Sequence, residues 1–202
     1  MKIINSDVKT DLTTGNPLRL NLGSGPNKRS GFYSVDHLAL DGVDVVADLN
    51  EPLDLFPDNC VESIYSRHTL EHIQNLLPLM HEIHRIVKPN GNIEIIVPHF
   101  SNVYGYSDPT HVRQFGLYSM YYFVDSEHQP EKRKVPPFYT DIRFRIRSID
   151  IEFYRAGLID RFFSALVYRI INRSFSLQEF YERRLSSFFH AWQIKYLMQP
   201  EK

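Results

Sequence analysis

Cysteine is nearly absent from this sequence, since Cys60 is the single one among 202 residues. A lone cysteine cannot form an internal disulfide, and it cannot supply the thiolate ligands of a structural zinc cluster. The sequence therefore lacks the mark of a disulfide-stabilised secreted domain, and we expect a reducing, cytoplasmic location.

Long hydrophobic runs and a strong net charge are missing as well. Apolar stretches such as residues 162–167 are far shorter than the roughly 20 residues that span a bilayer, and residues 1–17 have no signal-peptide core. The net charge is −1, yet acidic residues predominate in the first hundred residues and basic ones in the rest. The second half thus favours an anionic partner, whereas the near-neutral total charge argues against nucleic acid as that partner.

The first hundred residues have the pattern of an α/β domain. Short apolar segments, the expected strands, occur at residues 18–22, 32–36, 43–48, 61–65 and 93–97. The last of these is almost entirely apolar, as in a central strand of a parallel sheet that is covered on both faces. Residues 76–87 have helical spacing, and the Lys88-Pro89-Asn90-Gly91 sequence that follows them is typical of a helix end.

The second half is organised differently. Residues 99–140 are rich in His, Tyr, Pro and Ser without a long periodic run, which favours a lid or substrate-binding insertion. Residues 142–153 alternate as in an antiparallel strand, and residues 158–171 have helical spacing. A capping box at Ser176–Glu179 predicts a last helix whose apolar stripe would continue through Leu177, Tyr181, Leu185, Phe188, Trp192 and Tyr196. We therefore expect a tail over residues 1–17, a domain over 18–157 and a C-terminal helical extension over 158–202.

A glycine pair follows the first expected strand, and an acidic residue ends the next one. Gly23 and Gly25 let the backbone approach a ligand closely, and Asp36 is placed to accept hydrogen bonds from a ribose. Lys28 stands where a dinucleotide-binding motif needs its third glycine, and no Lys-Ser or Lys-Thr pair marks a phosphate loop. These residues predict an adenosine-containing ligand and disfavour pyrophosphate cofactors.

Five ordered segments give this sequence a family resemblance. They are Leu20–Gly25, Tyr33–Asp36, Val46–Leu49, Ser66–Ile73 and Glu82–Gly91. Over residues 18–98 the chain resembles the class I S-adenosylmethionine-dependent methyltransferases, in particular the branch with a Leu-Glu-His motif. Beyond residue 98, the segments Asp108–His111 and Phe180–Arg184 resemble small methyltransferases of saccharide and cell-envelope biosynthesis.

The resemblance implies a Rossmann-like fold with a mostly parallel seven-stranded sheet, an antiparallel last strand pair and S-adenosylmethionine as cofactor. It also implies which residues bind the cofactor. Gly23, Ser24 and Gly25 would lie along the methionine moiety, Asp36 at the ribose, Asp48 and Leu49 at the adenine, and Ser66, Arg67 and His68 under the sulfonium.

Two departures from the family pattern lie near the glycine pair. Asn21 replaces an acidic residue expected to contact the cofactor's ammonium group, and Pro26-Asn27 replaces the third glycine. The short spacing between Gly25 and Asp36 also implies that the usual first helix is very short or missing. We therefore expect a pocket that is more open on that side.

Histidines supply the candidate catalytic groups. His99 directly follows the expected fifth strand, and His111 follows Asp108 by three residues, so either could act as a base or contact the acceptor. The alternative is a structural hydrogen bond in each case. The spacings of His68 with His72, and of His81 with His84, suit metal binding, but no convincing third ligand accompanies them, and we expect no metal site.

The sequence thus predicts a methyltransferase that acts on a hydroxyl of a small neutral or anionic acceptor such as a saccharide, nucleotide sugar or lipid-linked precursor. The alternatives are a methyltransferase-like protein that binds the cofactor without turnover, and a nucleic-acid or protein methyltransferase. The arginines and aromatic residues of the C-terminal segment suit an anionic membrane surface, or else the aromatic residues pack on the sheet or against a second subunit.

Overall fold

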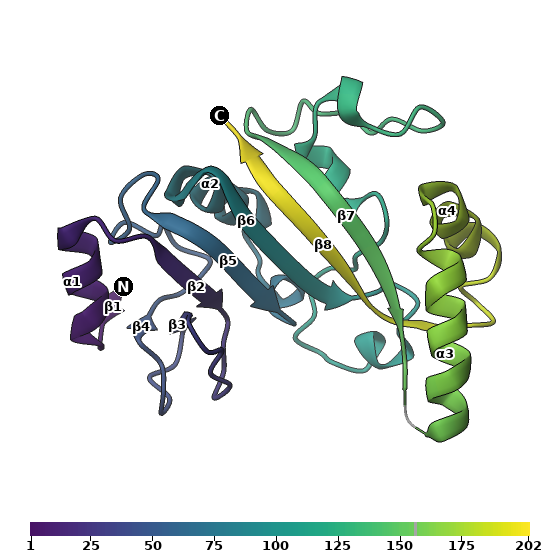
Figure 1. The fold of residues 1–202 in the computed structure, drawn as a ribbon, viewed down its shortest axis with the longest axis horizontal. Helices are drawn as coiled ribbons and strands as arrows, with labels where there is room; N and C mark the ends of the chain where they lie inside the picture. Colours follow the sequence, from purple (N-terminus) through teal and green to yellow (C-terminus); the bar gives the residue numbers. More distant parts are fainter. Residues whose placement is uncertain (156) are drawn as a thin grey trace.

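The computed structural model describes residues 1–155 and 157–202 of the protein. One mixed sheet of eight strands runs through it in the order β1-β4-β3-β2-β5-β6-β8-β7 (Figure 1). The strands are β1 (Lys2–Ile3), β2 (Leu18–Leu22), β3 (Tyr33–Asp36), β4 (Val45–Val46), β5 (Val61–Arg67), β6 (Val87–Pro98), β7 (Arg143–Phe153) and β8 (Ala191–Glu201). The expected α/β class is confirmed, with eight strands where seven were expected.

The centre of the sheet is parallel. β2 pairs with β3 and β5, β3 pairs with β4, and β5 pairs with β6, all in parallel register. The carboxyl ends of these five strands therefore meet at one edge of the sheet, which is where open α/β sheets bind ligands. Residues 23–32, between β2 and β3, contain no helix, as the short spacing before Asp36 predicted.

Both margins of the sheet are antiparallel. β1 pairs with β4 at one margin, and β8 lies between β6 and β7 at the other. The expectation of a last helix that extends to Tyr196 is wrong, because the helix α4 (Phe175–Arg184) ends early and residues 191–201 form β8. Trp192 and Tyr196 lie four residues apart, a spacing that places side chains on one face of a helix and also on one face of a strand.

The N-terminal segment is not the expected tail. Besides β1 it forms α1 (Ser6–Thr14), which the Asn5 side chain caps at its start and Gly15, with φ of 74°, ends. The Tyr33 hydroxyl donates a hydrogen bond of 2.7 Å to Asp11 and so ties this helix to β3. α1 has few apolar residues, and its sequence therefore gave no amphipathic signal.

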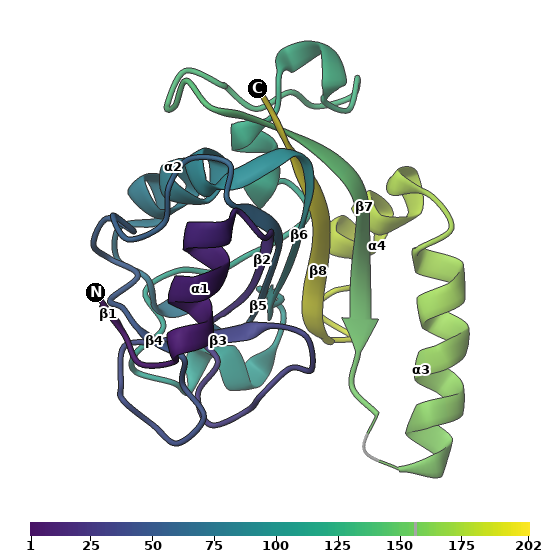
Figure 2. The same ribbon diagram turned by 60° about the vertical axis from the view of Figure 1, so that its left-hand side comes forward.

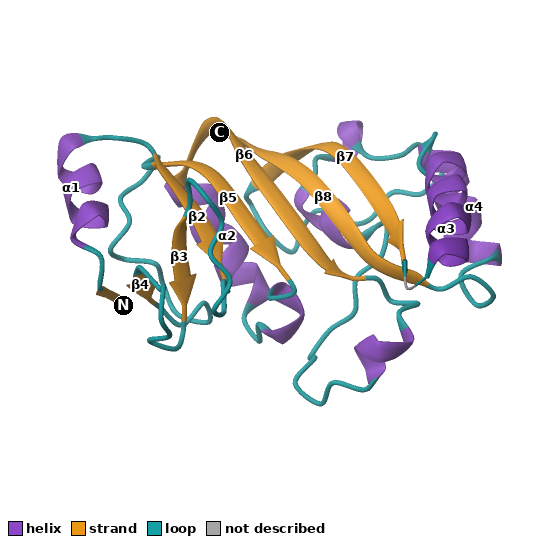
Figure 3. Ribbon diagram, turned by 60° about the horizontal axis from the view of Figure 1, so that its bottom comes forward, coloured by secondary structure: helices purple, strands orange, loops and turns teal. Residues whose placement is uncertain are grey.

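The helices α2 (Leu76–Ile86) and α3 (Leu158–Ile171) form where their spacing predicted. Figures 2 and 3 show α1 near the β2–β4 end of the sheet, and α3 with α4 beyond β7 at the other end. The expectation that the α3 aromatic residues pack on the sheet is wrong for Phe162, whose exposed fraction is 78%. Among the described residues, no helix is long and apolar enough to cross a membrane.

Residues 99–140 pack closely rather than forming one open loop. They contain the short 3-10 helices Val103–Tyr106, Ser119–Phe123 and Ser126–His128, and a further one, Leu70–His72, follows β5. Phe115, Leu117, Met120 and Phe123 from this segment are buried in the main hydrophobic core. The segment is thus anchored to the sheet over residues 115–124.

Candidate functional site

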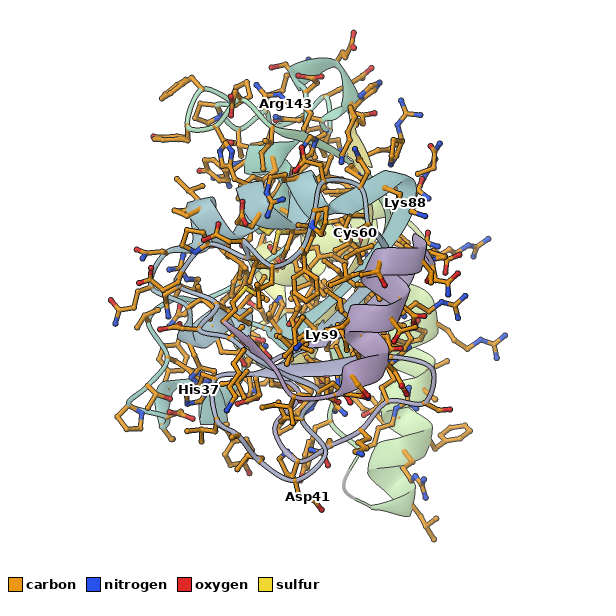
Figure 4. All side chains as sticks on the ribbon, turned by 90° about the vertical axis from the view of Figure 1, so that its left-hand side faces the viewer. Lys9, His37, Asp41, Cys60, Lys88 and Arg143 are labelled. Atoms are coloured by element: carbon orange, nitrogen blue, oxygen red, sulfur yellow. The ribbon has the colours of Figure 1, made fainter. Side chains whose placement is uncertain are left out.

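A cavity of about 530 Å³ lies at the carboxyl ends of the parallel strands. It is enclosed by the turns after β2, β3, β4 and β5, and Thr110 reaches it from the 99–140 segment. Six of the residues expected to bind a cofactor line this cavity, namely Gly23, Gly25, Asp36, Asp48, Leu49 and His68. Figure 4 shows His37, another lining residue, well away from Arg143, which lies near one end of the molecule in this view.

Gly23 and Gly25 differ in what surrounds the position of a side chain. Gly23 and Gly25 have φ of 66° and 54°, in the left-handed region that favours glycine. A Cβ at Gly23 would lie 2.2 Å from the Thr69 side chain, so the fold itself requires glycine there. A Cβ at Gly25 would meet no atom within 4 Å, and the space beside it is therefore open to a ligand.

Asp36 fixes the glycine turn from the end of β3. One carboxylate oxygen accepts a 2.8 Å hydrogen bond from the Gly25 amide, and the other accepts a 3.1 Å bond from the Leu38 amide. An ionised carboxylate can accept about four hydrogen bonds. Asp36 therefore holds the turn rigid and keeps acceptor capacity for hydroxyl groups of a ligand in the cavity.

Asp48 is held at the next turn along the sheet edge. Its Oδ1 accepts hydrogen bonds from the Asn50 amide and side chain, at 2.9 and 3.0 Å, and these bonds lower the pKa of Asp48 below its ordinary value. Asn50 in turn accepts bonds from the amides of Gln74 and Asn75 at the start of α2. The wall beside Leu49 is thus fixed to the helix.

Four other expected cofactor residues do not line the cavity. The Ser66 hydroxyl donates to the Leu22 carbonyl at 3.2 Å, and the Ser24 hydroxyl donates to the Gly25 carbonyl at 3.1 Å. Asn21 donates to the Asn27 carbonyl at 3.2 Å, and Arg67 is exposed at the end of β5. The first three therefore support the turns that carry Gly23 and Gly25.

His99 does not reach the cavity. Its side chain is fully buried, and Nδ1 accepts a 3.1 Å hydrogen bond from the Ser101 amide. Nε2 consequently carries the proton and donates to Glu182 at 3.1 Å. Both ring nitrogens are thus occupied by structural bonds, which is the alternative that the sequence left open.

His111 and Asp108 lie close to each other, on either side of Thr110 in the sequence, and neither lines the cavity. The His111 Nε2 is 3.7 Å from an Asp108 carboxylate oxygen, and its Nδ1 bonds the Gly105 carbonyl at 2.9 Å. Hydrogen bonds from Thr110 lower the pKa of Asp108 below its ordinary value. Because Thr110 lines the cavity, the pair stands directly behind the cavity wall.

Glu71 is a residue that sequence reasoning did not single out. It lies in the short helix after β5, its exposed fraction is 1%, and neither carboxylate oxygen has a hydrogen-bond partner among the described residues. His68 Nδ1 is 3.5 Å away, and His111 Nε2 is 4.0 Å away. The Leu-Glu-His motif contains this glutamate, but nothing in the sequence marks it as buried and without a partner.

His68 lines the cavity and lies beside Trp192, which lines a second, aromatic groove. It has φ of 53°, a strained value for a residue with a side chain. Its ring lies 6.3 Å from the Trp192 ring, and Nε2 is 2.9 Å from Oε1 of the Gln193 side chain. Trp192 helps to line a groove of about 320 Å³ whose wall also includes Tyr104, Phe153, Tyr154, Phe163 and Phe189. Sequence reasoning missed this groove because it assigned Trp192 to a helix.

Comparison with known proteins gives one family match and a set of structural likenesses. Residues 32–95, less than half of the chain, match the family model described as a methyltransferase domain. Among curated proteins the chain has no match.

Three solved structures share the fold at low sequence identity. The YcgJ protein of Bacillus subtilis is 12% identical with a TM-score of 0.52, covering 96% of this chain and 97% of its own. A SAM-dependent methyltransferase of Archaeoglobus fulgidus is 21% identical with a TM-score of 0.51, covering 97% and 94%. The [4+2]-cyclase SpnF is 14% identical with a TM-score of 0.52, covering 96% and 80%.

The site fits the cofactor that the family match implies, since the open space at Gly25, the carboxylate of Asp36 and the cavity between them suit a nucleoside. Residues 32–95 thus match the methyltransferase domain family, within a chain whose fold is similar to that of a SAM-dependent methyltransferase, and S-adenosylmethionine is the cofactor that the family match implies.

Proposed function

We propose that this protein transfers the methyl group of S-adenosylmethionine to a hydroxyl of a small molecule, namely a saccharide or a related cell-envelope precursor. The observation that carries the proposal is the position of His68 between the cofactor cavity and the groove lined by Trp192. This residue lines the cofactor cavity and lies against Trp192 of the aromatic groove, so a methyl donor and an acceptor would meet beside its ring.

The proposed step is an in-line displacement at the methyl carbon. The carbon–sulfur bond breaks and its electron pair stays on sulfur, while the acceptor oxygen forms a bond to carbon and loses its proton. Positioning and exclusion of water supply much of the rate for such a reaction. S-adenosylmethionine supplies the methyl group, and the chain's own residues orient the acceptor and remove the proton.

We assign the role of proton acceptor to His68. Gln193 donates from its amide nitrogen to Glu152, which leaves its carbonyl oxygen to accept from His68 Nε2. The neutral His68 ring therefore carries its lone pair on Nδ1, which lies 3.5 Å from the buried Glu71 carboxylate. A nearby carboxylate stabilises the imidazolium that forms when a histidine takes up a proton.

The aromatic groove is the proposed acceptor site. Aromatic walls contact the carbon–hydrogen faces of a sugar ring, and the exposed His190 at the groove can bond its hydroxyls. Arg143, Arg145 and Arg147 play no part in this proposal. They lie in β7 towards the opposite edge of the sheet, where Arg143 bonds Asp125 and Arg145 bonds Glu201.

The proposed function is tested by measuring the transfer of a radiolabelled methyl group from S-adenosylmethionine to a panel of candidate acceptors. The panel contains saccharides, nucleotide sugars and lipid-linked saccharides. We expect label in one acceptor class, and His68→Gln should retain cofactor binding while losing about 100-fold or more of the transfer rate. His128→Gln, at the other end of the molecule, is the matched control. Cofactor binding without transfer to any acceptor would identify a non-catalytic binding protein, and full activity of His68→Gln would refute the assigned role.

We also propose that α3 contacts an anionic membrane surface. Leu158, Phe162, Leu166 and Ile170 follow one side of this helix, and their exposed fractions are 85, 78, 49 and 51%. The exposed arginines Arg161, Arg169 and Arg173 lie on or just after the same helix. Exposed apolar residues bordered by cations are typical of helices that lie in a membrane interface.

Vesicle co-sedimentation tests this contact. We expect binding to phosphatidylcholine vesicles that contain phosphatidylglycerol, weaker binding without the anionic lipid, and loss of binding in Phe162→Ser/Leu166→Ser. Leu77→Ser, at an exposed site on α2, is the control. Absence of vesicle binding, or a dimer in solution that the double substitution dissociates, would overturn the proposal, and the latter would assign the face to a second copy of the chain.

A further inference from the structure

Three side chains with metal-binding atoms converge at the rim of the cavity. Glu71 and His72 come from the short helix after β5, and His111 comes from the 99–140 segment. One donor atom from each lies within 4.8 Å of the others. His72 also lines the cavity, so the cluster and the proposed methyl-transfer site share a wall.

The buried carboxylate of Glu71 is the first indication that this cluster binds a ligand. Its exposed fraction is 1%, and neither oxygen has a hydrogen-bond partner among the described residues. Burying an ionised carboxylate without hydrogen bonds is strongly unfavourable, and such groups are normally paired or bound to a metal. Glu71 therefore needs a cation that the described side chains do not supply at hydrogen-bonding distance.

The orientation of His111 is the second indication. A carbonyl oxygen can only accept a hydrogen bond, so the 2.9 Å contact with the Gly105 carbonyl places the proton of the neutral ring on Nδ1. The lone pair is then on Nε2, which faces Glu71 at 4.0 Å and Asp108 at 3.7 Å. The lone pair of His111 Nε2 thus points towards two carboxylates and not towards a hydrogen-bond donor.

His72 is oriented in the same way. The Thr110 hydroxyl donates its single proton to Asp108 at 2.5 Å and so accepts from His72 Nδ1 at 2.8 Å. The lone pair of the neutral His72 ring is consequently on Nε2. Backbone and side-chain contacts outside the metal-binding set therefore fix the tautomers of both imidazoles, as is usual for histidines that ligate metals.

We propose that Glu71, His72 and His111 bind a divalent first-row transition-metal ion. Two imidazoles and one carboxylate form a donor set that suits zinc or iron(II), whereas magnesium and calcium prefer oxygen ligands. Metal–ligand bonds of about 2.0–2.2 Å place ligand atoms roughly 3–4 Å apart, so only a small inward movement of the side chains is needed. The remaining coordination positions would be open to solvent or to an acceptor.

This site differs from the sequence-based expectation of no metal. That expectation considered the pairs His68 with His72 and His81 with His84, for which no cysteine and no convincing third ligand was identified. The fold supplies His111 from a distant segment and Glu71 from the adjacent position. A shared proton between Glu71 and an imidazole is the alternative, but distances of 3.5 and 4.0 Å exceed the 2.7–2.9 Å typical of charge-assisted hydrogen bonds.

A role in catalysis rests on the proposed function. A metal ion at this rim would hold the acceptor oxygen and lower the pKa of its hydroxyl, so that His68 would remove the proton more easily. The metal site itself requires neither the cofactor nor the acceptor. Metal binding can therefore be measured whether or not methyl transfer is found.

Metal titration of the chelator-treated, full-length protein tests the site. We expect one equivalent of Zn²⁺ by calorimetry and by elemental analysis after dialysis, and a rise in Tm when Zn²⁺ is added. Co²⁺ should give visible absorption bands characteristic of mixed nitrogen and oxygen ligation. His81→Gln, which alters a histidine on α2 outside the cluster, should behave as the parent protein.

The substitutions Glu71→Gln and His111→Ala should each weaken Zn²⁺ binding by about 100-fold or more. Glu71→Gln should also raise the Tm of the metal-free protein, because it removes a buried charge without a partner. His72→Asn provides a third variant if either of these fails to fold. Absence of stoichiometric Zn²⁺ binding in the parent protein, or equal affinity in Glu71→Gln, would overturn the proposal and favour a shared proton.

Discussion

Gly23 and Gly25 follow the same strand, yet their missing side chains serve different purposes. Gly23 is confined by Thr69, whereas Gly25 faces open space in the cavity wall. We expect Gly23→Ala to lower the Tm strongly, because its Cβ would overlap the threonine side chain. Gly25→Ala should cost only about 1–2 kcal/mol of stability from its left-handed backbone, yet weaken S-adenosylmethionine binding. Thermal unfolding together with calorimetry separates these effects, and equal Tm losses in both variants would contradict them.

At the scale of single residues, the positions of some residues at the sheet edge could be predicted, while their role in cofactor binding stays a prediction. Gly23, Gly25 and Asp36 follow strands that are evident from their apolar runs, and all three line the cavity. Glu71 and Trp192 could not be predicted in the same way. The burial of Glu71 and the contact of Trp192 with His68 depend on segments that are distant in the sequence.

At the scale of elements, Glu82 and Arg85 tie α2 to the turn before β5. Glu82 accepts hydrogen bonds from the Leu53 amide and from Arg85, and Arg85 donates to the Phe56 carbonyl. The bonds from Arg85 hold the pKa of Glu82 below its ordinary value of 4.5. The stability that depends on this charge is therefore complete above about pH 4.5 and is lost as the pH falls through the lower, folded-state value.

Glu82→Gln should accordingly reduce the free energy of unfolding by about 2 kcal/mol at pH 7. The difference from the parent protein should shrink as the pH falls below 4.5. Urea unfolding at several pH values measures this, with Glu51→Gln as an exposed control. A difference that is the same at pH 7 and pH 3 would show that the charge of Glu82 plays no part.

Elements with a clear apolar pattern were predictable, whereas α1, β8 and the short β1 were not. β2 and α3 have the bounds that their sequences predicted. α1 was missed because its stability comes from caps at Asn5 and Gly15 rather than from an apolar stripe. β8 was mistaken for a helix because the spacing of Trp192 and Tyr196 suits both structures, and pairing with β6 and β7 decides between them.

At the scale of the whole molecule, β8 joins the sheet to the 99–140 segment. Tyr196 is fully buried, and its hydroxyl donates a 2.6 Å hydrogen bond to the Gly116 carbonyl. Tyr196→Phe removes this bond and leaves the Gly116 carbonyl with its 2.9 Å bond from the Ser119 amide, and we expect a loss of about 1 kcal/mol of stability. Tyr106→Phe, at an exposed tyrosine in the same segment, should change it by less than about 0.5 kcal/mol. Chemical denaturation distinguishes the two, and equal effects would argue against the buried bond.

The central claim is that the cavity at the carboxyl ends of the parallel strands binds S-adenosylmethionine through the glycine turn and Asp36. Calorimetric titration with S-adenosylmethionine, S-adenosylhomocysteine and NAD in parallel tests it most directly. We predict micromolar binding of the first two, weak or no binding of NAD, and loss of binding in Asp36→Ala but not in the exposed variant Asp41→Ala. NAD binding of equal or greater strength, or unchanged affinity in Asp36→Ala, would contradict the account.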